Sequence, residues 1–140
     1  MKNLFLTAIL ALTFIGAKAQ SPNDDLVKVG DKMPAFSIVS DNGEVISSDK
    51  FKGKVILINF FATWCPPCQE ELKRVQKEII DRFKGKDFVF LAISREESKE
   101  QVKKFRERNG YTFPMGLDPE RKIYSKFATA TIPRNFIIDK

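Results

Sequence analysis

The sequence contains no histidine and only two cysteines, and both scarcities limit its chemistry. Without histidine there can be no Ser-His or Cys-His nucleophile pair and no histidine metal ligand. A structural zinc site usually takes four ligands, and this chain offers neither a third cysteine nor a histidine to complete one. We therefore expect no metal, and chemistry confined to thiols, carboxylates, amines and hydroxyls.

Several features that would indicate other classes of protein are also missing. The chain has no internal repeat, no low-complexity tract and no second-domain linker, so its 140 residues predict a single domain. The formal charge of +6 comes without a clustered basic patch interleaved with aromatics, which argues against nucleic acid as a partner. Apolar residues make up 43%, a share typical of a globular protein rather than a disordered one.

The one long apolar stretch lies at the start of the chain. A short basic segment precedes apolar residues 4–16, and Ala17-Lys18-Ala19 has the small-x-small form of a cleavage site. We interpret residues 1–19 as a secretory signal peptide, which predicts a periplasmic or otherwise extracytoplasmic protein. The alternative is an uncleaved membrane anchor, although the apolar run is shorter than the roughly 20 residues that a spanning helix needs.

The rest of the chain alternates strand and helix patterns. After a lead-in over residues 20–34, we expect a hairpin with strands at residues 35–39 and 45–46 around the turn Asp41-Asn42-Gly43, then a short turn or helical connection over 48–54. Continuous apolar runs at 55–61 and 88–93 predict strands buried on both faces. A final strand is expected at 135–138. This order predicts an α/β domain with a right-handed βαβ unit.

Helices are expected in the segments between these strands. Apolar residues at helical spacing predict a helix from Pro66 to Lys84, ended by Gly85. Ser98 and Gln101 form a capping-box pattern at the start of a second helix, which Asn109-Gly110 ends. Asp118-Pro119 is expected to cap a shorter third helix, whose inward residues are Ile123, Tyr124 and Phe127.

The two cysteines, Cys65 and Cys68, stand where the first buried strand passes into the first helix. At the helix N-cap, free N–H groups and the helix dipole would stabilise the thiolate of Cys65, which is the nucleophilic form. Cys68, one turn further on, could then resolve the mixed disulfide and release the substrate reduced. A purely structural disulfide is the alternative, although so short a loop would remove little chain entropy.

The segment around the cysteines resembles the TlpA/ResA-type thioredoxin-like family of bacterial envelope thiol:disulfide oxidoreductases. The resemblance runs from about Val29 to the end and depends on two distant motifs: Phe60-Phe61-Ala62-Thr63-Trp64-Cys65-Pro66-Pro67-Cys68 and Thr131-Ile132-Pro133-Arg134-Asn135. It implies a thioredoxin-like fold over residues 35–140, with a central mixed sheet flanked by helices and the hairpin as an N-terminal extra. Peroxiredoxins share the lead-in Gly30-Asp31-Lys32-Met33-Pro34, but their peroxidatic cysteine is not followed by Pro-Pro-Cys, so a thiol peroxidase ranks lower.

The resemblance also implies roles for residues near the cysteines. Pro133 matches the family's cis-proline and, with Ile132, would bind the substrate backbone; the alternative is an ordinary trans turn proline. Trp64 would offer an apolar contact surface to the substrate, or else belong to the core. Glu71 would exchange a proton with Cys68, or else be a solvated acid in the first helical turn like Glu70. The redox-active disulfide takes the place of a cofactor.

The resemblance further implies an enzyme that reduces protein disulfides such as those of apocytochromes, in cytochrome c maturation, or of mispaired envelope proteins. A membrane electron donor would keep it reduced. The chain departs from the family at its end, because family domains continue after Asp139 with another strand and a helix. We therefore expect the last strand and helix of the domain to be missing and residues 135–138 to form an apolar sheet edge. The alternative function is a redox-inactive binding module on the same scaffold.

Overall fold

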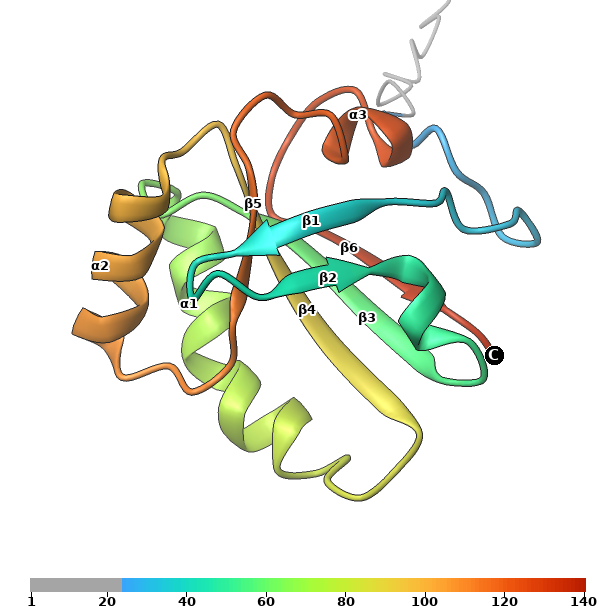
Figure 1. The fold of residues 1–140 in the computed structure, drawn as a ribbon, viewed down its shortest axis with the longest axis horizontal. Coiled ribbons are helices and arrows are strands. Elements are labelled where there is room, and N and C mark those ends of the chain that lie inside the picture. Colours follow the sequence, from blue (N-terminus) through green and yellow to red (C-terminus); the bar gives the residue numbers. More distant parts are fainter. Residues whose placement is uncertain (1–23) are drawn as a thin grey trace, which may run out of the picture.

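A computed structural model describes residues 24–140, so the predicted signal peptide and the first part of the lead-in lie outside the described residues. Six strands form one mixed sheet in the order β2-β1-β5-β4-β3-β6 (Figure 1). The three central strands are parallel, and the hairpin and the last strand are antiparallel to their neighbours. Their bounds are β1 Ser37–Ser40, β2 Val45–Ser47, β3 Val55–Phe61, β4 Phe88–Arg95, β5 Met115–Asp118 and β6 Arg134–Ile138.

Helical segments cover both faces of the sheet. They are η1 Ser48–Phe51, α1 Pro66–Val75, η2 Gln76–Ile80, α2 Lys99–Asn109 and α3 Tyr124–Phe127. Alternation along β3 and β4 divides the core in two, because neighbouring strand residues point to opposite faces. Ile58, Phe60 and Ile93 pack with α3 on one face, whereas Phe61 and Ala92 pack with α1 and α2 on the other. In residues 24–140, no helix is long and apolar enough to cross a bilayer.

The clearest sequence patterns give confirmed elements. The turn at Gly43, which has a φ of 90°, joins β1 and β2 with Ile38 opposite Ile46. Strand β3 has the predicted bounds, and the predicted 48–54 connection contains η1. At the start of α2 both hydrogen bonds of the capping box are present, and Gly110 ends the helix in the left-handed region with a φ of 68°.

The prediction of one α-helix from Pro66 to Lys84 was wrong in its second half. Regular α-helix ends at Val75 and gives way to the π-helix η2, in which the N–H of Asp81 bonds to the carbonyl of Gln76 at 2.9 Å. Phe83 is 39% exposed and stacks on Phe88, with ring centroids 4.6 Å apart. Phe83 therefore packs at the start of β4. A regular helix would instead have placed it on the core face with Leu72 and Val75.

Strand β5 was not predicted, because Gly116 interrupts its four residues and Pro114 and Pro119 flank them. Gly116 pairs with Ser40 of β1 and with Ile93 of β4, and a Cβ at this position would overlap the Cδ1 atom of Ile38. Any larger residue would therefore force the Cδ1 end of Ile38 to shift. The glycine that hides the strand in the sequence is the residue that fits against Ile38 without such a shift.

The third helix begins later than predicted. It spans only Tyr124–Phe127, and Asp118 caps it from the end of β5, where its Oδ2 accepts hydrogen bonds from the N–H groups of Ile123 and Tyr124 at 3.0 and 2.7 Å. The three residues expected to face inward are buried.

Strand β6 lies at one edge of the sheet and pairs with β3, from Phe60 opposite Arg134 to Ile56 opposite Ile138. Its Ile137 is 77% exposed, which agrees with the expected apolar edge. That the domain lacks a final strand and helix stays a prediction.

Candidate active site

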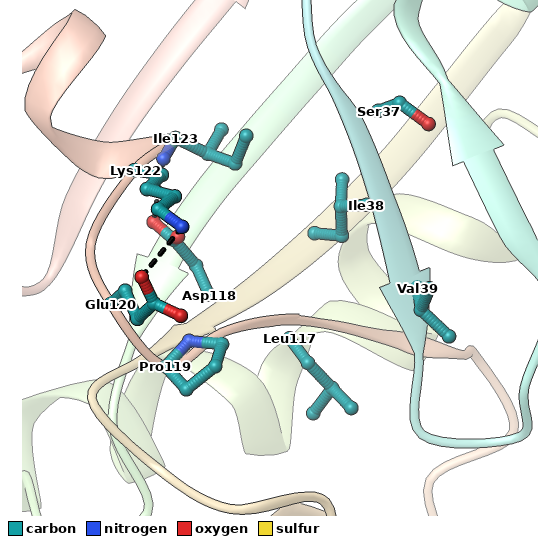
Figure 2. Close-up of a pocket in the computed structure, with 9 residues that line it drawn as sticks. All are labelled: Ser37, Ile38, Val39, Leu117, Asp118, Pro119, Glu120, Lys122 and Ile123. Carbon is teal, nitrogen blue, oxygen red and sulfur yellow. Dashed lines mark hydrogen bonds and ion pairs between the residues drawn. The ribbon is translucent and has the colours of Figure 1, made fainter.

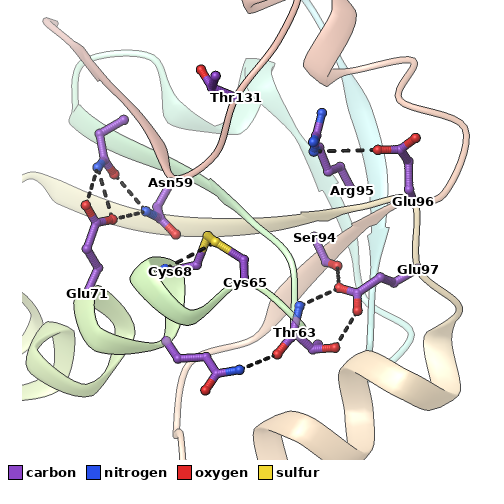
Figure 3. Close-up of a disulfide and its surroundings, with 12 residues drawn as sticks. Asn59, Thr63, Cys65, Cys68, Glu71, Ser94, Arg95, Glu96, Glu97 and Thr131 are labelled. Atoms are coloured by element: carbon purple, nitrogen blue, oxygen red, sulfur yellow. Dashed lines mark hydrogen bonds and ion pairs between the residues drawn. A yellow bond between two sulfur atoms is a disulfide. The ribbon is translucent and has the colours of Figure 1, made fainter.

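Cys65 and Cys68 form a disulfide at the junction of β3 and α1 (Figure 3). Cys65 is the N-cap residue of α1, and its Sγ accepts a hydrogen bond from the N–H of Cys68 at 3.3 Å. Pro66 and Pro67 occupy the first helical turn, where a missing N–H costs no helical hydrogen bond. The sulfur of Cys65 therefore already receives, in the disulfide, the hydrogen bond that would stabilise a thiolate.

The two cysteines are buried, but the side chain before them is not. Cys65 is 4% exposed and Cys68 is fully buried, whereas Trp64 is 60% exposed. This position excludes the interpretation of Trp64 as a core residue. An exposed indole beside a nearly buried disulfide offers apolar surface to anything that approaches Cys65.

Glu71 lies on the same side of α1 as Cys68, three residues further along. Its Oε2 accepts hydrogen bonds from the side-chain amides of Asn59 at 3.0 Å and of Asn135 at 3.2 Å. Glu71 is half-buried, unlike Glu70, which is exposed and pairs with Lys73 at 2.6 Å. The carboxylate is thus held in a polar network next to Cys68, and its proton-transfer role stays a prediction.

The loop before β6 contains the two other residues expected at the site. The Ile132–Pro133 peptide bond is cis, as the resemblance implies. Ile132 packs against the cluster of buried side chains that contains Cys65 and Cys68. The loop and the disulfide therefore share one apolar cluster, although they are far apart in the sequence.

Side chains from three segments anchor this loop. The hydroxyl of Tyr124 lies within hydrogen-bonding distance of the carbonyl oxygens of Ala130 and Thr131. Arg134 donates to the carbonyl of Ala130 at 2.9 Å and pairs with Asp25 at 2.7 Å. These contacts hold Thr131 at a φ of 65°, which is uncommon for a β-branched residue.

Sequence reasoning missed a buried carboxylate behind the cysteines. Glu97 is 3% exposed, and its Oε2 accepts hydrogen bonds from the N–H of Thr63 at 2.8 Å and the hydroxyl of Ser94 at 2.5 Å (Figure 3). Its other oxygen accepts from the hydroxyl of Thr63. Nothing in the sequence distinguishes Glu97 from the solvated Glu96 beside it, because Thr63, which donates two of its hydrogen bonds, is 34 residues away in the chain.

A hollow lies away from the cysteines, along β1 and the segment after β5 (Figure 2). Its charged groups are already paired: Lys122 binds Glu120 at 2.6 Å, and Asp118 caps α3. No cluster of acidic or cysteine side chains in residues 24–140 could hold a metal ion. The residues that line this hollow are Ser37, Ile38, Val39, Leu117, Asp118, Pro119, Glu120, Lys122 and Ile123.

The chain is similar to proteins named thiol-disulfide oxidoreductase ResA. It is 31% identical to the one from Bacillus anthracis over 114 residues, which cover 81% of this chain and 65% of that protein. With the one from Bacillus subtilis (strain 168) it shares 29% identity over 136 residues, 97% of this chain and 75% of that protein. The chain thus spans just under two thirds of the length of the first of these relatives.

Solved structures show the same fold. A proposed protein disulfide isomerase from Bacteroides thetaiotaomicron matches with a TM-score of 0.78 and 35% identity, over 83% of this chain and 75% of that one. A thioredoxin-family thiol:disulfide interchange protein from Chlorobium tepidum TLS matches with a TM-score of 0.66 and 33% identity, over 76% of each chain. These likenesses confirm the predicted thioredoxin-like fold.

The sequence profile of the AhpC/TSA family matches residues 29–140, which is nearly all of the described chain. The resemblance inferred from the two motifs is also confirmed by the ResA relatives and by the thioredoxin-fold structures. The chain belongs to the AhpC/TSA family, among members similar to ResA.

Proposed function

We propose that this protein is a thiol:disulfide oxidoreductase that reduces disulfides of protein substrates. The observation that carries the proposal is the Cys65–Cys68 disulfide at the N-terminus of α1, packed in one cluster with Ile132 of the cis-proline loop. The relatives' names support the same class of reaction. A structural disulfide would need neither the helix N-terminus nor the adjacent exposed Trp64.

The proposed reaction has two thiol exchanges. The Cys65 thiolate attacks one sulfur of the substrate disulfide, forms a mixed disulfide, and expels the other substrate sulfur as a thiolate that takes up a proton. Cys68 then loses its proton and attacks Cys65, which releases the second substrate thiol and closes the Cys65–Cys68 disulfide. Two electrons pass to the substrate in each cycle, and a second thiol donor must return them.

The substrate would dock beside Cys65, between Trp64 and the loop with Ile132 and Pro133. Trp64 supplies exposed apolar surface, and the loop supplies backbone groups for an extended peptide. Glu71 would take the proton of Cys68 in the resolving step, because it lies one helical turn from that residue in the Asn59–Asn135 network.

The proposed compartment is extracytoplasmic. The signal-peptide pattern of residues 1–19 and the resemblance to ResA support this location. There the enzyme would receive electrons from a membrane donor of a thiol-reducing pathway. Its substrates would be oxidised protein thiols, such as those of apocytochromes awaiting haem or of mispaired envelope proteins.

Two assays on the purified chain test the activity and separate it from the alternatives. With dithiothreitol as the electron source, the protein should accelerate insulin reduction, and the folded Cys65→Ser variant should not. Equal rates for the two folded proteins would contradict the proposal and favour a redox-inactive binding module. Hydrogen peroxide consumption by the same samples tests the alternative hypothesis of a thiol peroxidase, which predicts faster turnover of peroxide than of insulin.

A further inference from the structure

The side-chain amide of Asn59 is buried, and its nitrogen makes hydrogen bonds whereas its oxygen makes none. Its Nδ2 donates to Glu71 Oε2 at 3.0 Å and to Asn135 Oδ1 at 2.8 Å. Its Oδ1 is fully buried and has no hydrogen-bond partner among residues 24–140. Buried polar atoms without a partner are rare in folded proteins, so this oxygen calls for an explanation.

The orientation of the amide follows from its partners. Both groups that meet Nδ2 are oxygen atoms, and the carboxylate of Glu71 can only accept when it is ionised. Turning the amide over would set its oxygen against these acceptors. In Figure 3 the oxygen end of Asn59 is turned toward the disulfide, away from Glu71.

The position of Cys68 relative to this amide follows from that of Glu71. Cys68 and Glu71 are three residues apart on α1 and therefore lie on one face of the helix, with about 5–6 Å between such positions. Asn59, which binds Glu71 from β3, therefore lies on the side of α1 that carries Cys68, and Figure 3 shows its amide near the disulfide in that view. In the disulfide the sulfur of Cys68 carries no hydrogen and cannot donate to Asn59.

From this arrangement we infer that Asn59 accepts a hydrogen bond from the Cys68 thiol when the disulfide is reduced. The inference rests on the proposed function, since it concerns the redox cycle of the same cysteines. With dithiothreitol as reductant, the Cys65–Cys68 bond breaks and each sulfur gains one electron and one proton. Dithiothreitol loses the two electrons and two protons and closes to its cyclic disulfide. The new S–H group of Cys68 then donates a hydrogen bond to Oδ1 of Asn59.

This hydrogen bond would belong to one redox state only. The oxidised protein leaves the oxygen of Asn59 unpaired, whereas the reduced protein satisfies it, so Asn59 stabilises the reduced form. A neutral amide cannot take the proton, so Asn59 also holds Cys68 as a thiol while Cys65 makes the first attack. Its effect is to raise the reduction potential and to keep the two sulfurs in different protonation states.

The test is the equilibrium of the Cys65–Cys68 pair with dithiothreitol in the Asn59→Leu variant, which keeps the size and branching of the side chain. Without the acceptor, the ratio of oxidised to reduced protein at a fixed dithiothreitol redox ratio should rise about three- to tenfold, or roughly 15–30 mV toward more negative potential. An unchanged ratio in folded protein would overturn the inference.

Asn135→Thr is the matched control. Asn135 is exposed and also binds Glu71 and Asn59, but it leaves the oxygen of Asn59 in place. We expect its redox ratio to stay within about twofold of the parent, close to the limit of what one exposed hydrogen bond contributes. An equal shift in both variants would assign the effect to the Glu71 network and overturn the role of Asn59.

A spectroscopic measurement needs neither catalysis nor a substitution at Asn59. In the Cys65→Ala variant the sole thiol is Cys68, and its Raman S–H stretching band should lie below that of a thiol without a hydrogen bond. An S–H band at the frequency of a thiol without a hydrogen bond would overturn the inference, even if Asn59→Leu failed to fold. Failure of the insulin assay with a shifted band would instead reject the proposed function and leave the hydrogen bond established.

Discussion

The carboxylate of Glu97 binds both the backbone N–H and the side-chain hydroxyl of Thr63, two residues before Cys65. Through Ser94 the same carboxylate is tied to the end of β4. It thereby fixes the turn that delivers Cys65 to the N-cap of α1. Glu97 touches no reacting atom, so its part is to position that turn.

Replacing Glu97 with alanine should lower the free energy of unfolding by about 2–3 kcal/mol, because the N–H of Thr63 loses a buried, charged acceptor. Urea unfolding of the oxidised protein measures this change. In the reduced variant, alkylation of Cys65 by iodoacetamide should also change rate, since the helix N-terminus no longer holds the sulfur in a fixed place.

The control for this prediction is Glu96→Ala, one residue away. Glu96 meets Arg95 and Arg121 only at 3.6 and 3.9 Å, and its side chain is 44% exposed, so the loss should stay below about 1 kcal/mol. Equal losses at the two positions would show that the Thr63 contacts contribute nothing of their own.

The close approach of Gly116 to Ile38 predicts a strong coupling between β5 and β1. Gly116→Ala should cost about 1–3 kcal/mol, because the added Cβ overlaps Cδ1 of Ile38. Ile38→Val removes that carbon and alone should cost about 0.5–1.5 kcal/mol. The double variant should therefore be more stable than the sum of the two losses allows, as measured by thermal or urea unfolding. Simple additivity would mean that the two residues do not meet.

Glu71 should matter for the second thiol exchange and not for the first. In Glu71→Gln we expect release of the substrate from its mixed disulfide to slow by about 10- to 100-fold, within or below the usual range for a lost proton acceptor. Stopped-flow measurement of the two exchanges across pH checks this. Glu70→Gln, at an exposed position paired with Lys73, should leave both steps unchanged. An unchanged rate and pH profile for Glu71→Gln would remove Glu71 from the mechanism.

Much of the fold follows from local signals in the sequence. The apolar run of β3, the Asp41-Asn42-Gly43 turn and the Ser98 capping box each act within a few residues, and each predicted element is present. The same holds for Cys65 at the N-cap of α1, which depends on a strand followed directly by a helix.

What the sequence does not reveal depends on partners distant along the chain. Gly116 is explained by Ile38 and Glu97 mainly by Thr63, and neither partner is near in sequence. Tertiary contacts override the local pattern at these two positions. The end of α1 at Val75 was also not predicted, because helical spacing of apolar residues continues past it.

The central claim is that Cys65 attacks and Cys68 resolves, and trapping of the mixed disulfide tests it most directly. Each single Cys→Ser variant is reduced, mixed with oxidised insulin and quenched with acid, and the covalent complex is measured by mass spectrometry. The account predicts that Cys68→Ser accumulates an insulin adduct on Cys65, whereas Cys65→Ser, whose remaining sulfur is fully buried, accumulates little. An adduct that forms mainly on Cys68, or equally on both, would contradict it.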